Sequence, residues 1–411
     1  MGDANFQAGR AMGIPVVERA PGAETRRQPW LVPPRLRTAA DAPEERRATW
    51  LELFFDLVFV VAIAELTRQL VLDHSLSGFA EFAGLFVPVW VAWQGYMAYA
   101  DRFDSDDLAF RVAYFLAMLA IAAMAVLIPD VAIGIHSAGF AISYVALRSI
   151  MLGLYARAWR SAPAARPIIR FYGLGYSVSV AIWLLSLAFP TPTRYVFWGV
   201  ALALDLSLPP LSSKMRTRVP TSATHFPERW ALFTLIVLGE SVVAVALDTA
   251  GANWKLDSAA AAVFGFAAVA AIWWLYFDRQ ASVVLRPSTL IVVIYSYAHL
   301  PLLMGLAAMS AGLHLLIEHA GDDHLGLGPT AVFLGGIVVF VLSLVATRVV
   351  TVGGHHEVGV ALKLATVTLL ACLLAVEDVL SPVALAAATA VVLGALVVAE
   401  RWLFPEFGEV I

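Results

Sequence analysis

Long apolar runs separated by short polar loops occupy the chain from residue 50 to residue 402. Each run has about 18 residues or more, the length that an α-helix needs to cross the ~30 Å hydrocarbon core of a bilayer. The pattern therefore predicts an all-α, polytopic membrane helix bundle with about twelve transmembrane helices. The expected spans are residues 50–72, 79–99, 110–129, 133–156, 171–189, 194–211, 228–248, 258–277, 288–314, 329–350, 359–376 and 382–402.

The loop charges agree with twelve spans. Residues 157–170 contain four Arg and no acid, and residues 212–227 contain two Arg and one Lys, again without an acid. The loops around residues 248–257 and 318–323, which fall on the opposite side, are acidic instead. Because basic loops stay in the cytoplasm, this alternation predicts that both termini are cytoplasmic.

Composition supports the same class of protein. Of the 411 residues, 60% are hydrophobic and 14% are charged, whereas soluble domains have about 25% charged residues. The single cysteine, Cys372, excludes disulfides within the chain and cysteine-based metal clusters. Residues 1–49 contain eight Arg and six Pro, which predicts a disordered basic tail. We expect it to act as an orientation signal, with binding to anionic headgroups as the alternative.

Short sequence matches indicate an internal repeat. "YADR" at 99–102 matches "YFDR" at 276–279, and "LFF" at 53–55 matches "LFT" at 232–234. These offsets predict two six-helix halves, which would have the same orientation because six is an even number. The expected division is a first half at 50–211, a cytoplasmic linker at 212–227, a second half at 228–404 and a short tail at 405–411.

The first span, "LELFFDLVFVVAIAEL", carries acids on two faces. Asp56 lies one turn after Glu52 and shares its face, while Glu65 is nine residues beyond Asp56, about 900° around the helix. Arg68 follows on the side of Glu65 and can form a local ion pair. Charges inside a membrane span are costly and usually face protein or water. One polar face of this helix can therefore contact substrate while the other attaches the helix to a neighbouring one.

Other polar side chains lie inside apolar runs. Glu240 is near the middle of the seventh span, with Ser241 beside it. An acid at that depth can carry a proton or bind a cation, or it can hydrogen-bond to a neighbouring helix. Arg148 and Asp205 can pair with each other or with these carboxylates, and His299 can titrate near neutral pH or be a buried structural histidine.

Motifs of soluble enzymes are missing from the chain. There is no GxxxxGK[ST], GxSxG or HExxH pattern. The clusters "HAGDDH" at 319–324 and "HHE" at 355–357 are interpreted as solvated loops, so we expect no metal and no cofactor. A nucleic-acid partner has no support beyond the arginines of the tail, and the sequence leaves a homo-oligomer open.

Two segments, "ELFFDLVFVVAIAEL" and "ERWALFTLIVLGESVVAV", resemble the signature segments of the bacterial low temperature requirement A family. The resemblance covers residues 48–404 and implies a multi-pass protein of the bacterial inner membrane. It assigns the motif positions Glu52, Asp56, Glu228, Gly239, Glu240 and Ser241.

Three functions are compatible with these observations. The first is a secondary transporter in which Asp56 and Glu240 couple movement of an unknown small molecule or ion to protons or cations. The second is a membrane-embedded enzyme acting on lipid or a lipid-linked substrate, with an acid as general acid or base. The third is a structural membrane protein whose acids hold the helices together.

Overall fold

The computed structural model describes residues 30–37, 48–212, 215, 225–251, 255–278, 288–352 and 357–403. These residues contain twelve long helices, so the predicted all-α bundle is confirmed. They are α2 (Trp50–Leu72), α3 (Leu76–Arg102), α4 (Leu108–Ala132), α5 (Ser137–Ser161), α6 (Arg166–Ser186), α7 (Thr193–Leu211), α9 (His225–Gly251), α10 (Leu256–Phe277), α11 (Thr289–Glu318), α12 (Leu327–Val352), α13 (Glu357–Ala375) and α14 (Pro382–Leu403).

Ten of these helices are long and apolar enough to cross a membrane. The two exceptions, α2 and α7, fall short because of polar residues within them. The first contains Glu52, Asp56, Glu65 and Arg68, and the second contains Arg194, Asp205 and two prolines. Both helices carry candidate site residues: Glu52, Asp56 and Glu65 lie on α2, and Asp205 lies on α7.

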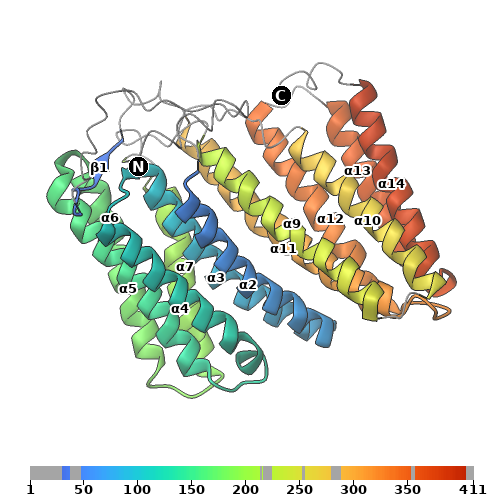
Figure 1. Ribbon diagram of the computed structural model, residues 1–411, viewed down its shortest axis with the longest axis horizontal. Helices are drawn as coiled ribbons and strands as arrows, with labels where there is room; N and C mark the ends of the chain where they lie inside the picture. Colours follow the sequence, from blue (N-terminus) through green and yellow to red (C-terminus); the bar gives the residue numbers. More distant parts are fainter. Residues whose placement is uncertain are drawn as a thin grey trace, which may run out of the picture.

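The packing partners follow the same order in the first six and the last six helices. In the first group α2 packs against α3 and α4, and contacts then run from α4 to α5, from α5 to α6 and from α6 to α7. In the second group α9 packs against α10 and α11, and contacts run from α11 to α12, from α12 to α13 and from α13 to α14. The pairs α3–α7 and α10–α14 correspond as well. The two groups lie next to each other in Figure 1.

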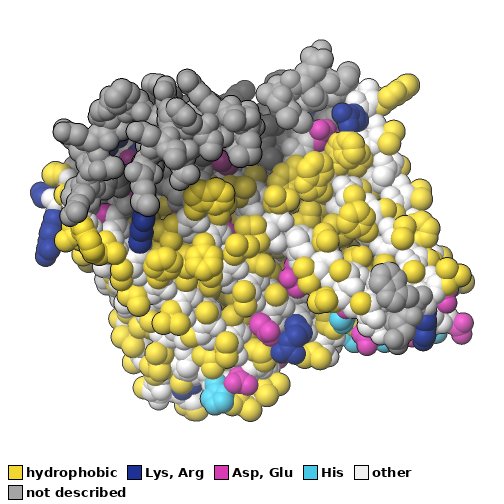
Figure 2. Space-filling view, viewed as in Figure 1, with side chains coloured by type: hydrophobic (Ala, Val, Ile, Leu, Met, Phe, Trp, Pro, Cys, Tyr) yellow, Lys and Arg dark blue, Asp and Glu magenta, His cyan; other side chains and the backbone are white. Residues whose placement is uncertain are grey.

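The two groups meet where α2 packs against α9 and α11. The bundle has two ends. The end at which α2 begins is called the cluster end, and the end at which α2 terminates is called the far end. Aromatic rings from α3 and α9 fill this junction: Trp93 stacks on Phe233 with ring centroids 4.1 Å apart, and its ring meets that of Trp230 edge-on at 4.7 Å. Many large hydrophobic side chains are exposed, as on a bilayer-facing surface, and Figure 2 shows them spread over much of the described part of the visible face.

Part of the N-terminal region lies against the bundle. Residues 30–37, which we call the docked segment, form the strand β1 (Arg35–Leu36), paired antiparallel with β2 (Phe103–Asp104) after α3. The backbone N–H of Val32 donates to Asp107 Oδ2 at 3.0 Å, and the Arg157 guanidinium donates to the carbonyl oxygen of Val32. The sequence predicted disorder throughout 1–49 because it lacks apolar runs; the docked segment is held instead by strand pairing with β2 and by the side chains of Asp107 and Arg157. Residues 1–29 and 38–47 lie outside the described part of the chain.

Candidate functional site

The first turn of α2 sets the positions of two buried carboxylates. Thr49 caps the helix, accepting from the backbone N–H of Glu52, while Glu52 Oε2 accepts from the backbone N–H of Thr49 at 2.7 Å. This capping box fixes where the helix begins. Asp56 follows one turn later on the same face, as the spacing predicted. Glu52 is 1% exposed and Asp56 is fully buried.

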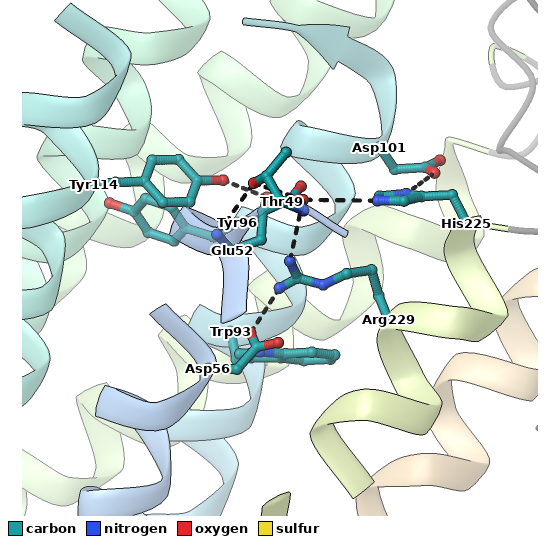
Figure 3. A network of polar contacts seen from close by, with 9 residues as sticks. All are labelled: Thr49, Glu52, Asp56, Trp93, Tyr96, Asp101, Tyr114, His225 and Arg229. Atoms are coloured by element: carbon teal, nitrogen blue, oxygen red, sulfur yellow. Dashed lines mark hydrogen bonds and ion pairs between the residues drawn. The ribbon is translucent and has the colours of Figure 1, made fainter. Parts of the chain in front are cut away.

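Arg229 on α9 joins both carboxylates. Its Nη2 lies 2.6 Å from Asp56 Oδ1, and its Nη1 lies 3.5 Å from Glu52 Oε2. Figure 3 shows the guanidinium pointing across the junction from α9 toward these acids. The three side chains are almost completely buried. Because ions buried without partners cost several kcal/mol each, this contact is a principal reason why α2 can hold two acids here.

Trp93 on α3 completes the surroundings of Asp56. Its indole N–H donates to Asp56 Oδ1 at 2.8 Å, so the same oxygen accepts from both Trp93 and Arg229. Asp56 Oδ2 is buried and has no hydrogen-bond partner among the described residues. A buried carboxylate oxygen in that state can take a proton or contact a cation or water.

His225, the first residue of α9, extends the arrangement toward the cluster end. Its Nδ1 lies 3.2 Å from Asp101 Oδ1 near the end of α3, and its Nε2 lies 3.8 Å from Glu52 Oε2. We call Glu52, Asp56, Asp101, His225 and Arg229 the ionic cluster. It brings the start of α2, the end of α3 and the start of α9 together through charges (Figure 3).

Arg148 and Asp205 form a separate buried pair. Arg148 Nη2 on α5 donates to Asp205 Oδ2 on α7 at 2.9 Å, and the Tyr144 hydroxyl donates to the same oxygen at 3.0 Å. The guanidinium also lies over the ring of Tyr176, 4.7 Å from its centroid. Of the pairings that the sequence allowed, these two residues therefore adopt the one with each other, within the first six helices.

His299 lies in an aromatic pocket between α9, α10 and α11. Its Nδ1 lies 2.7 Å from the carbonyl oxygen of Tyr295, so this nitrogen carries the proton. The Tyr276 hydroxyl lies 2.9 Å from Nε2 and serves as the donor to a neutral imidazole. Both nitrogens are satisfied, which is what a buried structural histidine requires. Its titration remains a prediction.

Glu240 and Glu65 are placed differently from the ionic cluster. Glu240 is half-buried on α9 and forms no hydrogen bond or ion pair with any described residue, while the neighbouring Ser241 is buried with its hydroxyl unpartnered among those residues. Glu65 forms an exposed ion pair with Arg68, 3.0 Å long, on the other face of α2. The two polar faces expected for this helix are therefore both present.

Gly239 and Glu228, the remaining motif positions, are half-buried on α9. The sequence did not single out Arg229 and His225 of the cluster, or Trp93, which donates to Asp56. Arg229 directly follows Glu228 in the second motif, at the start of an apolar run. A basic residue at that position was the sequence signal that could have identified it as a site residue. Among the described residues no group of three or more His, Cys, Asp or Glu side chains could hold a metal ion. The cluster "HHE" lies largely outside those residues.

The fold and the buried charges define an integral membrane protein of many helices, with an ionic cluster joining its two groups of helices. Residues 47–398 match the family model described as bacterial low temperature requirement A protein (LtrA), and the chain belongs to this family. It is also similar to an uncharacterized protein of Rhizobium meliloti (strain 1021), with 28% identity over 356 residues, covering 79% of this chain and 84% of that protein.

Proposed function

We propose that this protein is a secondary transporter in which Asp56 couples transport to binding of a proton or cation. One observation carries the proposal. Asp56 is fully buried between α2 and α9, with one oxygen held by Arg229 and the other without a hydrogen-bond partner among the described residues. A group in this position can change its charge at the surface where two helix groups would move against each other.

The coupling follows from the electrostatics of the pair. While Asp56 is charged, it attracts the guanidinium of Arg229 strongly, because little water screens the two charges. A proton or cation on the free Oδ2 cancels the negative charge and weakens this attraction. The cluster end of the junction then opens more easily. Binding at Asp56 thus favours one of the two states of the transporter.

The repeated packing order supports two structural halves. Each half would consist of six helices, residues 50–211 and 228–404, joined by the segment 212–227. Repeats with the same orientation are typical of one class of secondary transporter, in which the substrate site lies between the halves. By the loop charges, we place the cluster end on the cytoplasmic side of the bacterial inner membrane, with both termini inside.

Glu240 is proposed as a second ion-binding acid. It lies eleven residues after Arg229 on α9, about 1100° around the helix, which puts the two on nearly the same face. The rise between them is roughly 16 Å. Glu240 therefore lies on the same face of α9 as Arg229, closer to the far end. Its half-buried carboxyl, without a partner among the described residues, can receive an ion from that direction.

The enzyme alternative has less support at this site. A general acid or base must lie within hydrogen-bond reach of its substrate. Asp56 has no exposed surface, and one of its oxygens already accepts from Arg229 and Trp93.

Flux through reconstituted protein tests the proposal. Purified protein in liposomes would be challenged with gradients of candidate small molecules, with pH-sensitive and Na⁺-sensitive dyes inside. We expect a substrate-driven proton or cation flux in the wild type, which Asp56→Asn abolishes while the protein elutes normally from size exclusion. Arg68→Gln, in the exposed ion pair, is the matched control and should retain flux.

Two results would contradict the proposal. Equal flux in the wild type and in Asp56→Asn would show that this acid does not couple transport. Absence of flux with every candidate, together with altered lipid species in cells lacking the protein, would favour the enzyme alternative.

A further inference from the structure

An apolar groove opens at the far end of the bundle, away from the ionic cluster. It has a volume of about 470 Å³ and lies between the start of α3 and the pair α11–α12. Its walls include Phe79 from α3, Met304 and Ala308 from α11, and Ala331 and Val339 from α12. This volume is within the range of about 300–1,000 Å³ that is typical of ligand pockets.

The groove continues into a polar mouth. A second cavity of about 510 Å³ shares His74, Ser75, Leu327 and Gly328 with the groove. Asp73 and His319 also line it, at the ends of α2 and α11. One continuous recess thus runs from polar side chains at the helix ends to apolar side chains within the helices.

The depth of the groove corresponds to one leaflet of a bilayer. Its α12 wall extends over thirteen residues, from Leu327 to Val339, a rise of about 18 Å. Half of a ~30 Å hydrocarbon core is about 15 Å. The apolar part of the recess therefore covers the depth over which a single lipid chain runs.

Glycines on α11 and α12 make this space. A Cβ on Gly305 would lie 2.6 Å from the carbonyl oxygen of Gly336, so the two helices are in close contact there. A Cβ on Gly335, which lines the groove, would meet nothing within 4 Å. The helices are close at the Gly305–Gly336 pair, and Gly335 beside this pair leaves room for the groove.

We propose that this recess binds a membrane phospholipid, with one acyl chain in the groove and the headgroup in the mouth. At membrane depth the surroundings are hydrocarbon, so an acyl chain fills an apolar recess without burying any polar group. At the mouth, the His74 imidazole and the Ser75 hydroxyl can donate hydrogen bonds to phosphate and ester oxygens. His319 Nδ1 already donates to the carbonyl oxygen of Leu315 at 2.9 Å, so its Nε2 donates to a headgroup only when the ring is protonated. The change from apolar wall to polar mouth matches that of a phospholipid. The inference goes beyond transport and does not depend on it.

Native mass spectrometry of the full chain, released from gentle detergent, tests this site. We expect the wild type to retain one phospholipid mass, and Gly335→Phe to lose at least 80% of it because the ring fills the groove. Gly394→Phe is the control: Gly394 lies on α14, outside the groove, and its Cβ would also meet nothing within 4 Å. Equal retention in the wild type and both variants would overturn the proposal, and a retained free fatty acid would overturn the headgroup assignment.

A second experiment uses only the wild type, in case Gly335→Phe fails to fold. The protein is reconstituted with phosphatidylcholine that carries a diazirine on its acyl chain, irradiated, and digested. We expect adducts to concentrate on peptides that contain Phe79, Met304 or Ala331. Adducts spread evenly over outward-facing helices, with no enrichment at these peptides, would contradict the site.

Discussion

Arg229 Nη2 on α9 lies 2.6 Å from Asp56 Oδ1 on α2, although the two residues are 173 positions apart in the chain. Both side chains are almost fully buried, and Trp93 donates to the same carboxylate oxygen. The contact joins the first helix of one group to the first helix of the other. An ion pair that only stabilised α2 or α9 by itself would not need a partner so distant in sequence. We therefore interpret this pair as the connection between the two groups of helices.

Removing the cation from this pair should destabilise the protein strongly. Arg229→Gln leaves Asp56 buried without its cation, and losing one partner of a buried ion pair costs about 3–5 kcal/mol. Arg68→Gln breaks an exposed pair and should cost at most about 1 kcal/mol. Denaturant unfolding in detergent measures both free energies. Similar losses in the two variants would show that the Arg229 pair is not buried as described.

The indole N–H of Trp93 should contribute separately from its ring. Trp93→Phe removes the donor to Asp56 but retains an aromatic ring beside Phe233, so we expect a loss of about 1–3 kcal/mol. Trp90→Phe is the control, since the Trp90 N–H is buried without a partner among the described residues. In an Asp56→Ala background the effect of Trp93→Phe should nearly vanish. An unchanged effect in that background would rule out this hydrogen bond.

The two tyrosines around Arg148 should differ in their response to loss of the hydroxyl. The Tyr144 hydroxyl donates to Asp205 and accepts from Arg148 Nε at 3.0 Å, so Tyr144→Phe should lower the free energy of unfolding by about 1–3 kcal/mol. Tyr176 contacts Arg148 through its ring, which Tyr176→Phe retains, and we expect a change within about 0.5 kcal/mol. Thermal unfolding of both variants measures the difference, and the reverse order would contradict the assigned contacts.

Glu240→Gln should separate stability from function. The carboxyl is half-buried and has no partner among the described residues, so the substitution should change the free energy of unfolding by about 0.5 kcal/mol or less. Proton or cation flux in liposomes should fall if this acid carries the ion as proposed. Aggregation of the variant in size exclusion would show a structural role instead.

The docked segment should detach at acid pH. Burial raises the pKa of Asp107, but hydrogen bonds from the backbone N–H groups of Val32 and Phe110 and from Arg157 outweigh it and hold this pKa below its usual value. A depressed carboxyl pKa stabilises the folded contact above the unfolded pKa of about 4, and this stabilisation is lost as the pH falls through the folded pKa. Hydrogen exchange of residues 30–37, corrected for intrinsic rates, should show protection at neutral pH that decreases below about pH 4.

Asp107→Asn should reduce the protection of the docked segment already at neutral pH. Asp106→Asn is the control, because Asp106 pairs only with exposed Arg111 in the described contacts. Protection that is independent of pH and of Asp107 would contradict this role.

Much of the fold is predictable from the sequence because membrane spans are a local property. All twelve expected spans correspond to helices, and the Glu65–Arg68 pair follows from spacing within one helix. The contact of Arg229 with Asp56 depends on which helices pack together, and no local pattern gives that. His225 lay just outside the expected start of its span, and Trp93 looked like one of many aromatic residues in an apolar run. The docked segment was missed because backbone pairing leaves no hydrophobic signature.

The distance between α2 and α9 in the membrane tests the central claim most directly. Spin labels at Leu57→Cys and Leu235→Cys, both exposed, in a Cys372→Ser background can be measured by pulsed electron resonance in liposomes. We predict one short distance with Asp56 intact and a second, longer population in Asp56→Asn, where the attraction to Arg229 is weakened. Identical distance distributions in the two proteins would contradict the claim that this pair holds the two groups of helices together.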